Sequence, residues 1–352
     1  MTKISPVLRF FHPCVLERKL KTKPIKIQID GTPIALFRDG NNKPAAVLDR
    51  CPHRFTPLSA GAVEAGRIVC PYHGWNFDKS GCGKRPFDAN EAGVTCKVPA
   101  FKVIEKNGYL WVARKDVVEE VEIGEEGWDY IGAFGFESPA PLHVVLDNFN
   151  EDEHFPFVHK ILGWDAEGSR HIKHTARVEN DAIHVTYSAP QRKFFGMRLV
   201  GFAPKSQFNM QWAMHFNPIR ASYTASFTNA EDEDVSITHS RATIFFVPVD
   251  EYNTTIHVFL FYKPVKSWSS LVMSLTKNLF LYMARKDLES DLKLHKLVSH
   301  TPYDLKGMYL SPFDKPLQYS RALLEGVYFS DKLHRGERER TGLDGREKTP
   351  HL

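Results

Sequence analysis

Two short loops, each with one cysteine and one histidine, constrain this chain more than any other feature. The first reads Cys51-Pro52-His53, and after sixteen residues the second reads Cys70-Pro71-Tyr72-His73. Two thiolates and two imidazoles can also form a zinc site, but zinc fingers usually keep the two cysteines together and the two histidines together. The alternating order here instead favours a [2Fe–2S] cluster in which two histidines replace two cysteines on one iron.

The loop spacing, Cys-x-His, fifteen to seventeen residues, then Cys-x-x-His, is the signature of Rieske proteins. The flanking segments CPHR (51–54) and CPYHGW (70–75) resemble the Rieske domains of ring-hydroxylating and demethylating oxygenases. Rieske proteins of cytochrome complexes have an extra cysteine in each loop, and neither loop has one here. We therefore expect the cluster ligands to be Cys51, His53, Cys70 and His73, with Cys14, Cys82 and Cys96 as ordinary thiols.

Length and composition are ordinary. The 352 residues are enough for two domains, and the net charge of +4 is too small and dispersed to predict nucleic-acid binding. The N-terminus lacks the apolar core of a signal peptide, and the longest apolar stretch, 271–283, is interrupted by Ser, Thr, Lys and Asn. Five cysteines, two of them in a metal motif, favour a reducing compartment. We expect a cytoplasmic protein with no membrane or nucleic-acid partner.

The β-type runs are densest in residues 1–115. Turn residues punctuate them, such as Asp30-Gly31 and Asn107-Gly108, the second between two predicted hairpin strands. An acidic connection, 116–126, leads to alternating strands and a long helical segment from about Ser267 to Leu297. We predict an α+β protein: an all-β domain (1–115), a second domain of antiparallel sheet and helices (116–335), and a charged tail (336–352).

A second group of metal-type residues is the pair His154 and His159. Residues five apart do not share a face of a straight α-helix, but Pro156 must distort any helix between them, and a π-type turn would align them. Both histidines could then face one metal. The alternative is two surface histidines beside an acidic run.

The segment also matches the Rieske oxygenase pattern Asn-x-x-Asp-x-x-His-x-x-x-x-His, with Asn148, Glu151, His154 and His159 in register. This resemblance implies a catalytic domain of helix-grip type with a mononuclear iron, in a head-to-tail homotrimer. In such a ring the cluster of one subunit reduces the iron of the next. The family usually has Asp where this chain has Glu151, with Asp152 adjacent, so either acid is a candidate for the bridge between cluster and iron.

Two histidines and one carboxylate on one face leave iron positions open for O₂. Asp287 is our first choice for the carboxylate, because it falls on an apolar stripe of the late helix and a buried acid needs a cation or hydrogen bonds. Asp291, one turn later, is the alternative, and Glu289 points away.

The combined pattern predicts a terminal oxygenase that takes electrons from a separate ferredoxin or flavin reductase. It would hydroxylate or demethylate a small aromatic or cyclic substrate, by monooxygenation rather than dioxygenation. The alternatives are a Rieske-type electron carrier and a zinc-stabilised binding module. Candidate pocket residues, for which core packing is the stronger expectation, are Phe157, Leu162, Phe202, Met210, Trp212, Phe227, Phe245 and Phe259.

Overall fold

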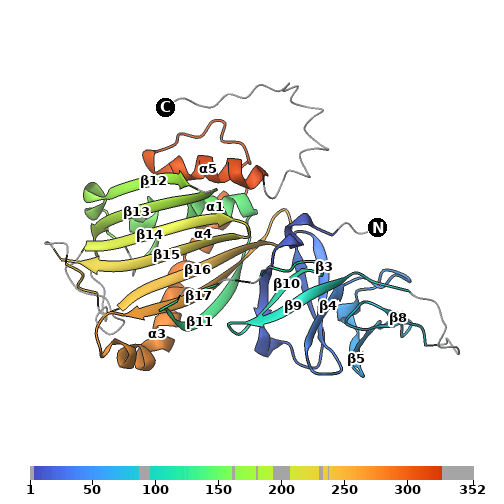
Figure 1. The fold of residues 1–352 in the computed structure, drawn as a ribbon. Coiled ribbons are helices and arrows are strands. Elements are labelled where there is room, and N and C mark those ends of the chain that lie inside the picture. The colour runs from blue at the N-terminus through green and yellow to red at the C-terminus, as the bar shows by residue number, and fades with distance from the viewer. Residues whose placement is uncertain are drawn as a thin grey trace.

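The computed structural model describes residues 4–86, 96–119, 121, 123–124, 126–160, 163–179, 181–192, 207–229, 233–236 and 238–326. The expected tail, 336–352, lies outside these residues. The described chain forms an N-terminal all-β part, followed by a large antiparallel sheet with helices (Figure 1). The α+β class predicted from the sequence is confirmed.

Two sheets make up the N-terminal part. The first is six-stranded, in the order β1-β10-β9-β4-β3-β2, and the second is β5-β6-β7-β8. Their strands are β1 (His12–Leu16), β2 (Ile25–Ile29), β3 (Thr32–Arg38), β4 (Pro44–Leu48), β5 (Ala62–Glu64), β6 (Arg67–Val69), β7 (Asn76–Phe77), β8 (Gly83–Lys84), β9 (Ala100–Lys106) and β10 (Tyr109–Arg114).

Tight turns close two hairpins of the six-stranded sheet. Asp30-Gly31 joins β2 to β3 with φ angles of 42° and 74°, and Asn107-Gly108 joins β9 to β10 with 50° and 71°. Two consecutive positive φ angles suit the right-handed twist of paired strands, and Asx-Gly adopts them at low cost. The hairpin predicted at Asn107-Gly108 is confirmed.

The second part is built on a seven-stranded antiparallel sheet in the order β11-β17-β16-β15-β14-β13-β12. Six of its strands, β12 to β17, each pair with the next strand along the chain, so most contacts are between consecutive segments. The strands are β11 (Asp129–Ser138), β12 (Lys173–Glu179), β13 (Ala182–Pro190), β14 (Gln207–Phe216), β15 (Ile219–Thr228), β16 (Thr238–Pro248) and β17 (Thr254–Pro264).

Helices cover one face of this sheet (Figure 1). Helix α1 (Leu142–Phe149) contacts β16, α3 (Ser269–Glu289) contacts β11 and β17, and α5 (Lys315–Leu324) contacts β12 and β13. Gly132 of β11 admits α3 closely, because a side chain there would meet Leu281. Among the described residues no helix has the length and apolarity needed to span a membrane.

The long helix expected from 267 to 297 is two helices. Helix α3 ends at Glu289, and α4 (Asp291–Val298) follows after Ser290. The Ser290 hydroxyl donates to the Asp287 carbonyl at 2.5 Å, a local bond of the kind that bends helices. Asp291 is the first residue of the new helix, and because Ser290 keeps helical backbone angles, φ −63° and ψ −29°, Asp287 and Asp291 both reach His159.

The two parts pack through the other face of the large sheet. Trp111 of β10 is fully buried, with ring centroids 4.9 Å from Phe245 and 5.3 Å from Phe259. Val117 and Val121 of the acidic connection join the same cluster, so this segment is more than a surface linker. The large sheet is therefore covered on one face by helices and partly on the other by the N-terminal β-structure.

Because Trp111 fills this interface, Trp111→Ala should lower the free energy of unfolding by about 3–5 kcal/mol. Urea unfolding followed by circular dichroism measures the change. The matched control, Val118→Ala at an 85% exposed position, should change it by less than about 0.5 kcal/mol. Equal effects of the two substitutions would contradict the packing role.

Candidate metal centres

The four predicted cluster residues lie on two loops with the same backbone turn. The carbonyls of Cys51 and Cys70 each accept from the residue four positions on, Phe55 at 2.8 Å and Gly74 at 3.0 Å. Each cysteine N–H donates to the carbonyl five positions on, at 2.9 and 2.7 Å. Phe55 and Gly74 both have positive φ, 60° and 70°. The repeated turn gives each loop one cysteine at its base and one histidine nearer its tip.

The side chains of the two loops converge. The rings of His53 and His73 lie with centroids 4.5 Å apart, and Trp75 stacks on His53 at 4.7 Å. Cys51 and Cys70 are both buried. Burial, with a smaller contribution from Cys70, raises the pKa of the Cys51 thiol to about 11. A thiolate at this position therefore needs a positive charge beside it, which a metal centre supplies.

The second site surrounds a single helical turn. Helix α2 (Phe155–Val158) has His154 as its N-cap and His159 as its C-cap, with Pro156 in its first turn, where proline is tolerated. The expected π-type or kinked helix is absent from this described segment. The helix instead ends at Val158, and His159 has extended backbone angles, φ −79° and ψ 142°. This early ending turns both imidazoles to the same side.

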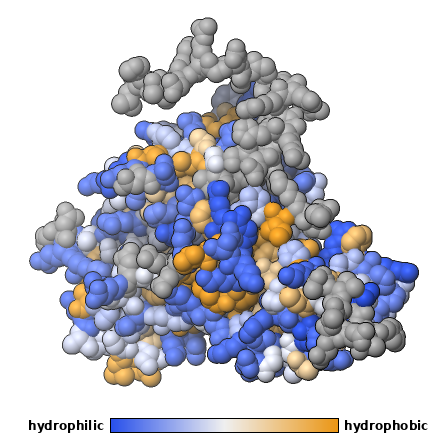
Figure 2. Space-filling view, turned by 45° about the vertical axis from the view of Figure 1, so that its right-hand side comes forward, coloured by the Kyte–Doolittle hydropathy of each residue, from blue (hydrophilic) through white to orange (hydrophobic). Residues whose placement is uncertain are grey.

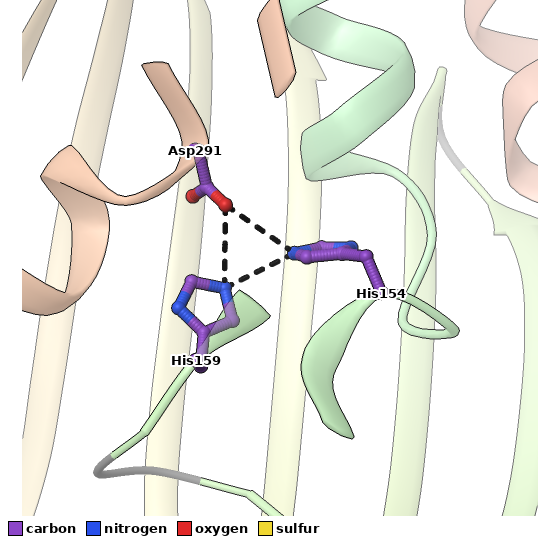
Figure 3. A group of neighbouring side chains, drawn as sticks. All are labelled: His154, His159 and Asp291. Carbon is purple, nitrogen blue, oxygen red and sulfur yellow. Dashed lines mark hydrogen bonds and ion pairs between the residues drawn. The ribbon is translucent and has the colours of Figure 1, made fainter. Parts of the chain in front are cut away.

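The two imidazoles and Asp291 form a triangle of potential ligand atoms (Figure 3). His154 Nε2 lies 3.1 Å from His159 Nε2, and Asp291 Oδ1 lies 3.7 Å and 3.5 Å from these two nitrogens. Ligands about 2.1 Å from a metal and at right angles to each other lie about 3.0 Å apart. Asp291 Oδ1 is buried without a hydrogen-bond partner. The donor set therefore fits a metal ion on a two-histidine, one-carboxylate face.

Asp287 occupies a different place from the one expected. Its Oδ2 lies 3.4 Å from His159 Nδ1, on the opposite edge of the ring from Asp291, and its Oδ1 accepts from the Lys160 N–H at 3.2 Å. Asp287 and Asp291 thus face the two nitrogens of one imidazole. Burial lowers the pKa of His159, but the two acids outweigh it, so the pKa is raised above its usual value. In the geometry shown, Asp291 faces the triangle and Asp287 orients His159.

The two acids before His154 have separate environments. Glu151 Oε1 lies 2.5 Å from His154 Nδ1, and its Oε2 accepts from the His154 N–H at 3.2 Å. Asp152 is 2% exposed and lies 3.6 Å from His174 Nε2, away from this contact. Burial, and next the charge of Glu151, raises the pKa of Asp152 well above its usual value. Of these two acids, only Glu151 touches a residue of the triangle, His154.

Comparison with known proteins follows the division of the fold. Residues 11–101 match the family model of the Rieske [2Fe–2S] domain. The chain contains a Rieske domain. In curated relatives the matched segment covers less than half of each protein. Dicamba O-demethylase, oxygenase component, of Stenotrophomonas maltophilia is 31% identical over 159 residues, 43% of this chain and 47% of the relative. The 4beta-methylsterol monooxygenase of Methylococcus capsulatus is 47% identical over 110 residues, 29% of each.

Solved structures extend the Rieske likeness to the whole fold. Dicamba monooxygenase bound to dicamba superposes with a TM-score of 0.74 at 19% identity, covering 94% of this chain and 99% of that one. NdmA of Pseudomonas putida CBB5 with caffeine gives 0.66 at 19% identity, covering 93% of both. The resemblance to demethylating Rieske oxygenases is confirmed for the domain and the fold. The predicted cofactor set, a [2Fe–2S] cluster and a mononuclear iron, is supported by the domain match and the His-His-Asp triangle.

Behind the triangle lies a hydrogen-bonded chain that the sequence did not indicate. His295, fully buried on α4, bonds through Nε2 to Asn148 Oδ1 at 2.8 Å and through Nδ1 to Ser138 Oγ at 2.9 Å. An amide oxygen only accepts, so Nε2 carries the proton and the Ser138 hydroxyl donates to Nδ1. His295 follows Asp291 by four residues on the same helix face. That spacing was the one available signal.

Arg192 is a second residue that the sequence did not indicate. Its guanidinium donates to the carbonyls of His159 and Trp164, and to that of Pro156 at 3.3 Å. One side chain thereby ties together both ends of the loop that carries His159. Because Arg192 is 33 residues from His159, no local spacing could have linked them.

A cavity of about 110 Å³ adjoins the triangle. Asn148 and Tyr223 contribute polar atoms, but the Tyr223 hydroxyl is engaged with the Phe149 carbonyl at 2.6 Å. Most other lining residues are apolar, among them Phe149, Ala225, Ala242, Ile244, Leu260 and Phe280. The space beside the triangle is therefore small and largely apolar.

The expected pocket residues fare unevenly. Met210 lines the cavity. Phe245 and Phe259 pack instead in the cluster between the sheets, and Phe157 is 72% exposed. Trp212 and Phe227 are buried in the main core, while Leu162 and Phe202 lie outside the described residues.

Titration of His295 predicts a pH effect on stability. Burial, with a smaller contribution from His154, lowers its pKa to about 4, below the 6.5 of an unfolded chain. Neutral His295 therefore makes its full contribution to the free energy of unfolding above pH 6.5. That contribution falls by up to about 3 kcal/mol as the pH drops toward 4. The gap in melting temperature between the wild type and His295→Gln should narrow from pH 7 to 4.5. The exposed control, His300→Gln, should show no such trend. A constant gap for His295→Gln would disprove the assignment.

Proposed function

We propose that this chain is the terminal oxygenase of a multicomponent system. It would use O₂ and electrons from a separate ferredoxin or flavin reductase to hydroxylate or oxidatively demethylate a small organic substrate. The His154–His159–Asp291 triangle beside an apolar cavity carries this proposal, because an electron carrier has no need of a second metal centre. The names of the relatives, an O-demethylase and a monooxygenase, favour monooxygenation.

The cluster ligands in this proposal are Cys51, His53, Cys70 and His73. Their support is the family match together with the two equivalent turns that bring the histidine rings to 4.5 Å. Both thiols are buried, whereas His53 is exposed and His73 half-buried. The histidine edge of the cluster would therefore face outward, toward a redox partner.

The mononuclear iron ligands in this proposal are His154, His159 and Asp291, with Asp287 orienting His159. When bound, iron at such a two-histidine, one-carboxylate site supplies O₂ activation. The chain's own groups would position the substrate in the apolar cavity and limit the access of water. The Asn148 amide, fixed by His295, is the polar group best placed to orient a substrate.

We propose a substrate that is aromatic or cyclic and largely apolar. Among the described cavity residues, the charged groups that lie away from the metal triangle are Asp152 and Arg241. The Nε of Arg241 donates to Thr224 Oγ1 at 3.0 Å, and its guanidinium stacks over Trp128 at 4.5 Å, on the outer side of the sheet. Dicamba, caffeine and a methylsterol, named with the relatives, are all cyclic compounds.

Electron transfer in this proposal runs between subunits of a head-to-tail trimer. The sheet β5–β8 with its two loops lies at the opposite side of the molecule from α3 (Figure 1). Phe55 and Tyr72, 61% and 56% exposed, flank the histidine edge and offer apolar contact to a neighbour. The cluster would approach Glu151 of the neighbouring subunit. Electrons would then pass from Glu151 to His154 through their 2.5 Å contact.

We further propose domain limits of 1–115 and 116–335, a charged tail at 336–352, and a cytoplasmic location. The cluster loops and their sheets end with β10 at Arg114, and the large sheet begins with β11 at Asp129. The limits rest on this change of sheet.

Iron content tests the oxygenase proposal. The wild type should hold three irons per chain, and a count of two would leave only the electron carrier. Asp291→Asn should reduce the count to two and abolish turnover, with an unchanged visible cluster spectrum. Asp287→Asn should keep three irons at saturating Fe(II) and lose about 10- to 100-fold in turnover, because it removes only the orienting contact. The reverse pattern would restore Asp287 as the ligand.

Mixed trimers test the route of the electrons. Cys70→Ser chains lack the cluster and His154→Ala chains lack the mononuclear iron, so each variant alone should be inactive. In an equal mixture, about a quarter of the junctions pair an intact cluster with an intact iron site, so about a quarter of wild-type turnover should return. The control mixture, His154→Ala with Asp291→Ala, should stay inactive. Inactivity of the first mixture, with trimers verified by size, would refute transfer between subunits.

A further inference from the structure

Helix α3 exposes a row of large apolar side chains. They recur at intervals of three and four residues, which aligns them along one side of a helix of 21 residues. Their exposed fractions lie between 44% and 77%, and they are Trp268, Leu271, Leu275, Leu279 and Tyr282. Single exposed apolar residues are common on proteins, but a continuous row marks an interaction surface. In Figure 2 hydrophobic surface gathers at the lower left edge, where α3 lies in Figure 1.

The same segment is strongly basic. Residues 263–286 contain five Lys or Arg and no Asp or Glu. Arg285 and Lys286 pair with Glu289, at 2.7 and 3.1 Å, which moderates the charge at the C-terminal end. The cations nearest the N-terminal half are Lys263, Lys266 and Lys277, all exposed. An apolar row with Trp and Tyr at its two ends and cations beside it is typical of helices that lie in a membrane interface.

The opposite face of α3 lines the cavity at the metal triangle. Phe280, Ala284 and Leu288 all contribute to that lining. One helix therefore has an outward apolar face and an inward face at the candidate active site. A surface that contacts lipid at this point would place the cavity next to a reservoir of apolar compounds.

We propose that α3 docks this protein on the surface of an anionic phospholipid membrane. The docking revises the expectation of no membrane partner, and it involves lying on the surface rather than crossing it. Its link to substrate supply rests on the proposed oxygenase function, whereas the docking itself does not. A symmetric contact between two copies of α3 is disfavoured, because it would bring Lys263, Lys266 and Lys277 of both copies together.

Co-sedimentation of the cofactor-loaded full chain with vesicles tests the docking. The protein should pellet with vesicles of phosphatidylcholine containing phosphatidylserine, and less as NaCl is raised, since salt screens the attraction. Leu275→Glu should weaken binding at least tenfold. The matched control is Leu297→Glu, a leucine of α4 that is 76% exposed against 77% for Leu275, and it should bind as the wild type does. Lys277→Gln should weaken binding roughly fivefold.

Binding that is absent, or equal on pure phosphatidylcholine, would overturn the proposal. So would equal losses in Leu275→Glu and Leu297→Glu. The remaining alternative is that the row forms a contact between copies of this chain, and sedimentation of the proteins without vesicles tests it. If Leu275→Glu changes the oligomeric state, the row is such a contact and the membrane proposal fails. None of these measurements depends on turnover, so they stand whether or not the oxygenase proposal holds.

Discussion

The candidate active site depends on the burial of negative charge. Asp291 is 2% exposed, and its Oδ1 has no hydrogen-bond partner, although two imidazoles face it. Burial raises the pKa of Asp291, the two histidines acting in the opposite direction. Asp287 and Glu151 add further acidic groups to the same small volume. An uncompensated buried carboxylate is costly, and a divalent cation at the triangle would balance these acids at once. Metal binding and stability of this region are therefore coupled.

The sheet provides the rigid support for this charged cluster. Its strands are tied by hairpins, one face carries the helices that bear the ligands, and the other carries Trp111 and the N-terminal β-structure. The candidate ligands lie at the ends of helices. Helix α2 stops at Val158 and so turns His159, and Asp291 is the first residue of α4. Arg192 donates to the Pro156 carbonyl of α2, and His295 of α4 bonds to Asn148, so both segments are tied to the surrounding chain.

The sequence predicted those features that are encoded locally. The Cys-x-His and Cys-x-x-His loops, the Asn107-Gly108 turn and the pair His154 and His159 are all short-range patterns, and the structure brings each of them together. The sequence favoured Asp287 over Asp291 because Asp287 falls on an apolar stripe of the late helix. Both acids reach His159, one at each ring nitrogen, and which acid faces His154 as well depends on tertiary packing that periodicity does not reveal. Arg192 was out of reach for another reason: its role depends on chain segments that meet only after folding.

Glu151 contacts both the backbone of its own loop and the imidazole of a candidate metal ligand. Its Oε2 accepts from the backbone N–H groups of Glu153 at 2.6 Å and His154 at 3.2 Å, which holds the turn before α2. The same carboxylate contacts His154 Nδ1 through Oε1 at 2.5 Å. The two oxygens of this carboxylate therefore reach the backbone and the imidazole at the same time. Asp152 is left to face the interior, where only His174 lies near its carboxylate among the described ion-pairing groups.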